Sequence, residues 1–182
     1  APQGVLAKAA PLEETLLADL LVAPRDKPLM LVAIDGVTDP GNLGAILRCC
    51  DGAGVDAVIL PRHRAVHITP TVAKSSAGAI EYLNMCVVGG LPSALSEMKT
   101  AGVVVVGLDD SAEKSIFELG AVATDSVCLV LGAEGPGLSR LVRERCDLLA
   151  NIPMLGSLSS LNVSVAAALA TYEIVRTRRV SK

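Results

Sequence analysis

The feature that most constrains the fold of this chain is the alternation of short apolar runs with longer segments of helical periodicity. The clearest run is "VVVVGLD" at residues 103–109, and others cover residues 29–35, 55–60, 82–88, 126–132 and 148–152. Apolar residues recur at helical spacing over residues 42–53, 69–80, 91–101, 138–146 and 161–178. Thr69 and Pro70 suit the N-cap and the first turn of the second of these helices. This alternation predicts an α/β fold with a mostly parallel sheet flanked by helices.

The core of such a fold must here be built almost entirely from aliphatic side chains. Apolar residues make up 51% of the 182 residues, but the only aromatic ones are Phe117, Tyr82 and Tyr172. The length suits one domain, which we place at residues 25–182, with residues 1–24 as a linker remnant or N-terminal arm. No apolar run is long enough to span a membrane and no secretory signal is visible, so we expect a cytoplasmic protein.

Cysteine content and charge narrow the range of functions. The five cysteines are scattered and include no CxxC pair, which is typical of free thiols in a reducing compartment. The net charge of −3 argues against a nucleic-acid partner, because phosphate binding normally requires a basic surface. Arginines nevertheless gather around His63, along residues 140–145 and near the C-terminus. Composition alone therefore leaves an RNA partner open.

Three loops that follow predicted strands combine glycines with polar side chains. They are "DGVTDPGNLGAILR" at residues 35–48, "LGAEGPG" at residues 131–137 and "IPMLGSLSSLN" at residues 152–162. Parallel sheets bind ligands beyond the carboxyl ends of their strands, so a site is expected among these loops. The first loop lacks the Lys-Ser/Thr pair of a phosphate loop, and Glu134 replaces a glycine that a dinucleotide fingerprint requires.

Each polar residue in these loops also has a purely structural interpretation. Asn42 suits a helix N-cap, Glu134 suits a helix cap or an ion pair with an arginine, and Ser160 and Asn162 suit caps of the last helix. Capping accounts for one of the last two residues, but not for all the polar side chains between residues 157 and 162. His63 and His67 are four residues apart in a predicted loop without a third ligand, so no metal site is expected.

In order and spacing, the three loops resemble the three signature motifs of the SpoU, or TrmH-like, family of RNA ribose 2'-O-methyltransferases, within the SPOUT superfamily. "DPGNLGAILR" is similar to motif one, "LVLGAEGPGLSRLVRERCD" to motif two and "IPMLGSLSSLNVSVAAALATYE" to motif three. The match covers nearly the whole chain. The resemblance implies S-adenosylmethionine as the methyl donor, a homodimer, and a C-terminal trefoil knot that strand alternation alone would not predict.

The resemblance also implies residue roles by motif position. It implies a catalytic role for Asn42, Arg48, Glu134, Ser160 and Asn162. It implies a donor pocket lined by Leu108, Gly132, Ile152, Pro153, Leu155 and Leu161. The family interpretation makes Arg48 the residue that activates the ribose hydroxyl. Because a guanidinium keeps its proton in proteins, we expect Arg48 instead to hold a phosphate and to stabilise the charge that develops on the 2'-oxygen.

The substrate that the resemblance implies is 23S ribosomal RNA, with transfer RNA as the alternative. A catalytically silent RNA-binding module with the same fold is a rival interpretation, against which the presence of all five catalytic residue types argues. A dehydrogenase is disfavoured because the dinucleotide fingerprint is absent. Many relatives carry an RNA-binding domain before a segment similar to "QGV" at residues 3–5, and the resemblance leaves open whether such a domain has been removed here.

Overall fold

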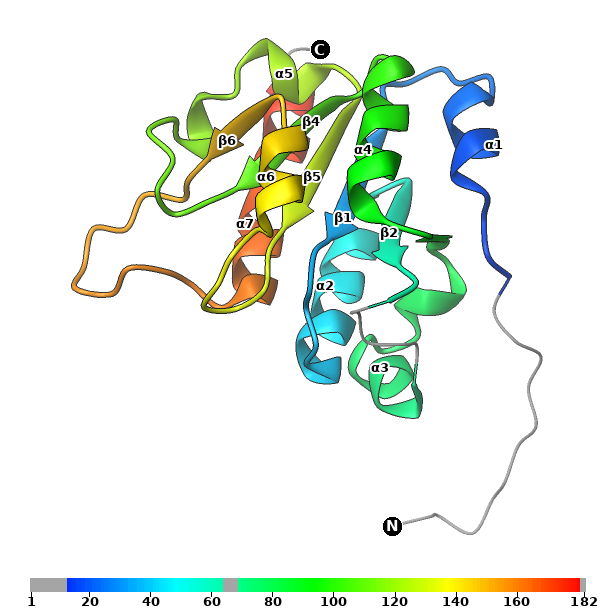
Figure 1. Cartoon of the computed structure of the whole chain (residues 1–182), viewed down its shortest axis with the longest axis horizontal. Helices are drawn as coiled ribbons and strands as arrows, with labels where there is room; N and C mark the ends of the chain where they lie inside the picture. The colour runs from blue at the N-terminus through cyan, green and yellow to red at the C-terminus, as the bar shows by residue number, and fades with distance from the viewer. Residues whose placement is uncertain (1–12, 64–68, 181–182) are drawn as a thin grey trace, which may run out of the picture.

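A six-stranded sheet, parallel throughout, organises the computed structural model, which describes residues 13–63 and 69–180 (Figure 1). The strand order is β3-β2-β1-β5-β4-β6. The strands are β1 (Met30–Ile34), β2 (Ala57–Pro61), β3 (Asn84–Val88), β4 (Val104–Leu108), β5 (Val127–Leu131) and β6 (Leu148–Ala150). Every strand expected from the apolar runs is present. β1, β4 and β5 are one residue shorter than the run at each end, β3 and β6 are two residues shorter at one end, and β2 starts two residues later and ends one residue later than its run. The predicted α/β class is confirmed.

Helices cover both faces of the sheet. They are α1 (Leu17–Val22), α2 (Pro40–Ala53), α3 (Pro70–Ser75), α4 (Leu91–Thr100), α5 (Ala121–Thr124), α6 (Arg140–Arg145) and α7 (Val163–Val180), with single 3-10 turns η1 (Ala79–Glu81) and η2 (Ile116–Glu118). One core contains residues of α2, α3, α5 and α7, and the other contains residues of α1, α4 and α6. No helix within residues 13–63 and 69–180 has the length and apolar character to cross a membrane.

Successive side chains of the central strand β1 enter the two cores in turn. Met30, Val32 and Ile34 belong to the core on the α2 and α7 side, whereas Leu31 and Ala33 belong to the core on the α4 side. All five residues of β1 are buried. Parallel strands covered on both faces have this continuous burial, which explains why they are encoded as unbroken apolar runs.

Two predicted helices differ from the structure in extent. The helix expected over residues 69–80 is capped as predicted, because the Thr69 hydroxyl accepts a hydrogen bond from the Val72 N–H at 3.3 Å. It ends at Ser75, since Ala77 and Gly78 both adopt positive φ angles (52° and 87°), and a separate 3-10 turn follows. The helix expected over residues 138–146 is confined to α6.

The N-terminal segment that was expected to be a linker or arm is partly helical. Within the described part of it, Leu17 and Leu21 of α1 are buried in the core that also contains α4. The Thr15 N–H donates to the Met85 carbonyl at 2.9 Å, which attaches the segment to the edge strand β3. Residues 15–22 therefore pack on the domain, while the boundary at residue 25 stays a prediction.

The carboxyl ends of the strands meet at one edge of the sheet and are joined there by hydrogen bonds. The Asp35 N–H, just after β1, donates to the Leu131 carbonyl at 2.8 Å, and the Asp109 N–H donates to the Ala150 carbonyl at 3.0 Å. These bonds hold the loops that follow β1, β4, β5 and β6 next to one another. The trefoil knot implied by the family resemblance stays a prediction.

Candidate functional site

Three residues from the three separate loops meet in one hydrogen-bonded cluster. The side-chain amide nitrogen of Asn162 donates to the Asn42 side-chain oxygen at 3.0 Å and to the Glu134 carboxylate at 2.7 Å. Asn42 lies in the first turn of α2, Glu134 in the loop after β5, and Asn162 just before α7. Residues 120 and 28 positions apart in the chain are thus in direct contact. We call Asn42, Glu134 and Asn162 the polar cluster.

Asn42 is available for the polar cluster because another residue caps its helix. The Asp39 carboxylate accepts a hydrogen bond from the Asn42 N–H at 2.7 Å, which is the N-cap interaction of α2. Pro40 occupies the first turn, where its missing N–H costs nothing. The structural interpretation of Asn42 as an N-cap is therefore wrong, and its side chain faces Asn162 instead.

Asn162 both caps a helix and joins the polar cluster. Its side-chain oxygen accepts from the Ser164 N–H at 2.9 Å and from the Ser164 hydroxyl at 2.6 Å, at the start of α7. Its side-chain nitrogen makes the two bonds within the polar cluster. The side-chain oxygen of Asn162 thus caps the helix, as the capping interpretation expects, whereas its side-chain nitrogen faces the site. The helix begins at Val163, two residues later than expected.

Glu134 is presented by a tight turn that glycine makes possible. Ala133 and Gly137 exchange backbone hydrogen bonds at 3.0 and 2.9 Å, and Gly135 and Gly137 adopt positive φ angles (85° and 68°). A Cβ on Gly132 would lie 2.3 Å from the Gly137 carbonyl carbon, so only glycine fits there. Glu134 neither caps α6 nor forms an ion pair with an arginine of the described residues. Its carboxylate instead accepts a hydrogen bond from Asn162.

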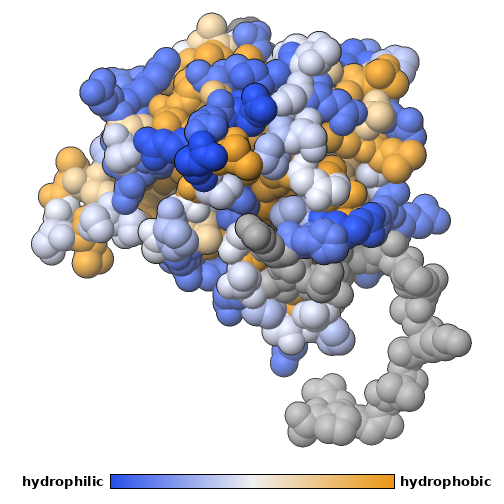
Figure 2. Space-filling model, in the orientation of Figure 1, coloured by the Kyte–Doolittle hydropathy of each residue, from blue (hydrophilic) through white to orange (hydrophobic). Residues whose placement is uncertain are grey.

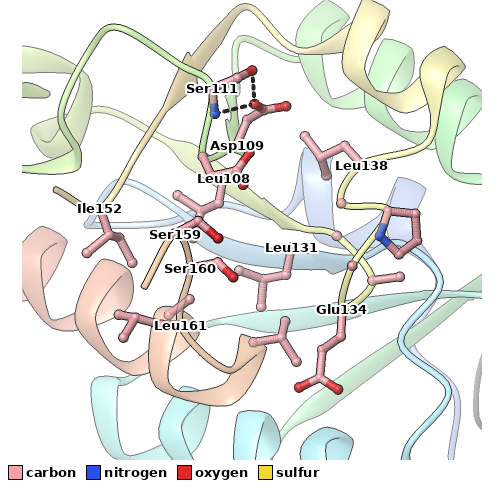
Figure 3. Close-up of a pocket in the computed structure, with 18 of the residues that line it drawn as sticks. Leu108, Asp109, Ser111, Leu131, Glu134, Leu138, Ile152, Ser159, Ser160 and Leu161 are labelled. Atoms are coloured by element: carbon pink, nitrogen blue, oxygen red, sulfur yellow. Dashed lines mark hydrogen bonds between the residues drawn. The ribbon is translucent and has the colours of Figure 1, made fainter. Parts of the chain in front are cut away.

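A cavity of about 240 Å³ lies beside Glu134, at the carboxyl ends of β4, β5 and β6 (Figure 3). Among the expected pocket residues, those that line it are Leu108, Gly132, Ile152 and Leu161. Ser160 and Glu134, expected to be catalytic, line it as well. In Figure 3, Ser159 and Ser160 lie between the end that Glu134 marks and the end that Asp109 and Ser111 mark.

Pro153 and Leu155, also expected in the pocket, do not line the cavity. They belong to the long loop between β6 and α7, which extends away from the sheet (Figure 1). The Leu155 side chain is 99% exposed. Figure 2 shows hydrophobic side chains at the left edge of the molecule, where Figure 1 places this loop. Met154, which lies between these two residues, does line the cavity, and a role for Pro153 and Leu155 in the donor pocket stays a prediction.

Arg48 is not brought to the polar cluster within one chain. It lies on the exposed surface of α2, six residues after Asn42. That separation corresponds to about 9 Å along the helix axis and roughly 120° around it. Asn42 and Arg48 therefore point in different directions, although both belong to motif one.

The described residues offer neither a metal centre nor a reactive thiol. They contain no group of three His, Cys, Asp or Glu side chains arranged to hold a metal ion, and His67 lies outside the described residues. All five cysteines are free. Burial raises the pKa of Cys86 and of Cys146 to about 11, and it raises the pKa of Cys50 and Cys128 further. These four thiols stay protonated at neutral pH and are poor nucleophiles.

Sequence reasoning missed three residues at the end of the cavity away from Glu134. Asp109, Ser111 and Arg143 line the cavity and contact one another. Asp109 directly follows β4, the clearest strand in the sequence, and this position at the carboxyl end of a strand could have identified it as a site residue. Nothing in the sequence shows that Arg143, 34 residues later, turns toward it.

Comparisons with known proteins agree with this geometry. The model of the SpoU rRNA Methylase family matches residues 29–172. The chain is 47% identical over 178 residues to the 23S rRNA (guanosine-2'-O-)-methyltransferase RlmB of Ralstonia nicotianae, covering 98% of this chain and 71% of that protein. It is 44% identical to the putative TrmH family tRNA/rRNA methyltransferase YacO of Bacillus subtilis, covering 97% of this chain and 71% of that protein.

A solved structure shares the fold. The SpoU methyltransferase AviRb from Streptomyces viridochromogenes, in complex with the cofactor AdoMet, superposes with a TM-score of 0.78 at 33% identity. The match covers 87% of this chain but 64% of that one, so this chain spans less than two thirds of the length of AviRb.

Proposed function

Because the chain belongs to the SpoU rRNA methylase family, we propose that it transfers a methyl group from S-adenosylmethionine to a ribose 2'-oxygen of RNA. The observation that carries this proposal is the polar cluster, in which one residue of each family motif meets the others beside a cavity. The names of the most similar proteins favour 23S ribosomal RNA as the substrate. Transfer RNA is the alternative, since the name of YacO includes both kinds of RNA.

The cavity has the chemistry that this donor requires. Leu131, Ala150 and Ile152 give it an apolar wall that suits an adenine ring, and Gly132 leaves its backbone bare at the cavity. Gly132 cannot be replaced without a clash, so this bare backbone is enforced by the fold. When bound, the donor supplies a methyl group on a positively charged sulfur. The residues that line the cavity would hold it beside Glu134.

The polar cluster would position the ribose. Asn42, Glu134 and Asn162 hold one another in place before substrate binds, so their remaining donors and acceptors are oriented in advance. Holding two reactants in the attacking geometry can supply roughly 7–11 kcal/mol of the barrier. Ser160, which lines the cavity, adds a hydroxyl at the same place. The cluster thus contributes mainly alignment rather than an acid or a base.

Arg48 would supply the positive charge. Its guanidinium would hold a phosphate of the RNA and stabilise the ribose 2'-oxygen as the hydroxyl proton leaves to water. Within one chain Arg48 points away from the polar cluster, so a site that contains both would need a second chain.

The homodimer implied by the family resemblance is supported by an exposed apolar stripe on α7. Val165, Leu169 and Tyr172 lie on one face of the helix at spacings of four and three residues, and each is 40–50% exposed. The stripe adjoins α2, because a Cβ on Gly52 would lie 3.1 Å from the Tyr172 hydroxyl. Arg48 is one helical turn before Gly52 on the same face of α2. A second copy seated on the stripe would therefore contact Arg48, and we propose that the site is completed in this way.

Two other classes of function would give different ligand preferences. A silent RNA-binding module would bind RNA but not the donor, and a dehydrogenase would bind NAD. Calorimetric titration of the purified protein with S-adenosylhomocysteine and with NAD separates these classes. We expect saturable binding of the first compound and none of the second. Binding of NAD alone, or of neither compound, would rule out the methyltransferase. The RNA substrate also makes the cytoplasm the proposed location.

A further inference from the structure

The end of the cavity away from Glu134 is closed by a charged group of three residues, of which only Arg143 lies within one of the three motif segments. An Arg143 side-chain nitrogen contacts the Asp109 carboxylate, and the other terminal nitrogen donates to the Ser111 hydroxyl at 3.2 Å. Asp109 also accepts from the Ser111 N–H at 2.9 Å. Figure 3 shows Asp109 and Ser111 at this end, with the length of the cavity between them and Glu134. We call Asp109, Ser111 and Arg143 the charged end.

The hydrogen bonds within the charged end show which of its residues still has a free donor or acceptor for a ligand. The other oxygen of Asp109 accepts from the N–H and the hydroxyl of Ser111, so both carboxylate oxygens have partners. The Ser111 hydroxyl both donates and accepts. A guanidinium has five N–H donors, and Arg143 uses two of them in the described part of the chain. The groups of the charged end that are available to a ligand are therefore the remaining N–H donors of Arg143.

The orientation of Arg143 is fixed while part of it stays accessible. The Asp109 side chain is 7% exposed and the Arg143 side chain 44%. A buried carboxylate at the end of β4 thus holds a half-exposed guanidinium at the rim of the cavity. Such an arrangement orients the fork of an arginine toward an anion before the anion arrives. Arg143 is also the only basic residue among those of the described chain that line the cavity.

The remainder of the cavity indicates which anion this is. Between the two ends the wall combines the apolar side chains of Leu108, Leu131, Ala150 and Ile152 with the hydroxyl groups of Ser159 and Ser160. The apolar side chains suit the adenine of the donor, and none of these six residues carries a positive charge for its carboxylate. The donor carries a single anionic group, the carboxylate of that amino-acid part. We propose that Arg143, held by Asp109 and Ser111, binds the α-carboxylate of the methyl donor.

This assignment rests on the proposed function and has two competitors. Arg143 would instead bind an RNA phosphate if the rim of the cavity faced the substrate rather than the donor. It would bind nothing if the ion pair merely fixed α6 to the loop after β4. The carboxylate is favoured because Arg143 is the only basic residue among the described residues that line the cavity, whereas RNA backbones are bound by several exposed cations.

The test compares two ligands that differ only in the carboxylate. Calorimetry measures the dissociation constants of S-adenosylhomocysteine and of its decarboxylated analogue for the wild-type protein, for Arg143→Gln and for the control Arg140→Gln. Arg140 lies on the same helix, pairs with Glu144 and does not line the cavity. We expect the wild type and the control to bind S-adenosylhomocysteine roughly tenfold more tightly than the analogue. Arg143→Gln should bind both ligands equally, and Arg143→Lys should keep part of the difference.

Three results would overturn the proposal. A wild-type protein that does not distinguish the two ligands has no carboxylate site. A variant Arg143→Gln that weakens both ligands to the same extent shows that the charged end is only structural. Unchanged ligand binding together with weaker RNA binding assigns Arg143 to a phosphate. If none of the proteins binds S-adenosylhomocysteine, the proposed function itself has failed.

Discussion

Asn162 uses the two ends of its side-chain amide for different purposes. The oxygen accepts hydrogen bonds at the start of α7, and the nitrogen donates to Asn42 and Glu134. The helix cap fixes the position of the side chain, so the donor that faces the site is held without a separate supporting residue. Stability and function therefore meet in one residue, and a substitution can be chosen to separate them.

Substitution Asn162→Ser should remove the function and keep the cap. Serine is as good an N-cap as asparagine, so the free energy of unfolding should change by less than about 0.5 kcal/mol. The donor to Asn42 and Glu134 disappears, and methyl transfer to RNA should fall at least tenfold. Thermal unfolding and transfer of a radiolabelled methyl group measure the two effects. The control Asn162→Ala should lose activity and also about 1 kcal/mol of stability. Full activity of Asn162→Ser would show that the polar cluster plays no part in the reaction.

Substitution Arg48→Lys tests how the proposed cation acts. Lysine keeps the charge but not the planar fork that binds phosphate through two donors. We expect methyl transfer to fall about tenfold or more, with the affinity for S-adenosylhomocysteine unchanged, since Arg48 does not line the cavity. Rates of transfer and calorimetry give the two values. A lysine variant as active as the wild type would mean that a point charge is sufficient.

At the scale of elements, the position of α2 is set by close contact with α3. Gly44 faces Ser75, whose hydroxyl donates at 3.1 Å to the carbonyl of Pro40, in the same first turn of α2 as Asn42. A Cβ on Gly44 would lie 1.9 Å from the Ser75 Oγ and 2.9 Å from the Ser75 backbone carbon. The first turn of α2, and with it the polar cluster, depends on this contact.

Gly44→Ala should accordingly destabilise the protein, whereas Gly52→Ala in the same helix should not. The first substitution forces α2 and α3 apart, at a cost of about 1–3 kcal/mol. The second meets only the Tyr172 hydroxyl at 3.1 Å and gains up to about 1 kcal/mol of helix propensity. Chemical denaturation of both variants provides the comparison. Equal stability of the two would refute the view that this contact positions α2.

The sequence predicted the strands well because they are buried on both faces. Runs such as residues 103–109 and 126–132 contain little but aliphatic residues between turn signals, and both became strands. The short elements α1, α5 and η2 were missed, whereas α3 and α6, with six residues each, were predicted as parts of longer helices. The break after Ser75 was missed because it depends on a positive φ at Ala77, which the residue type does not indicate.

For the site, the sequence predicted which loops lie together, whereas the role of each residue stays a prediction. The convergence of Asn42, Glu134 and Asn162 followed from loops at one edge of a parallel sheet. The direction of the loop that carries Leu155 and the pairing of Asp109 with Arg143 depend on contacts between distant segments, which no local pattern encodes.

At the scale of the whole molecule, the stripe of Val165, Leu169 and Tyr172 leads to a prediction about assembly. Substitution Leu169→Glu places a charge in the centre of the proposed interface, so the variant should be monomeric where the wild type is dimeric. Its methyl transfer should fall because Arg48 would lose its site. Sedimentation analysis measures the mass. The control Leu141→Glu, at an exposed position of α6, should stay dimeric. A monomeric wild type would refute the shared site.

The most direct test of the account is the identity of the methylated atom. Unmodified 23S ribosomal RNA is incubated with the purified protein and S-adenosylmethionine, digested to nucleosides and analysed by mass spectrometry. The account predicts one nucleoside methylated at the ribose 2'-oxygen, formed by the wild type and at least tenfold less by Asn162→Ser. A methyl group on a base, or no methylation of any RNA by a protein that binds the donor, would contradict it.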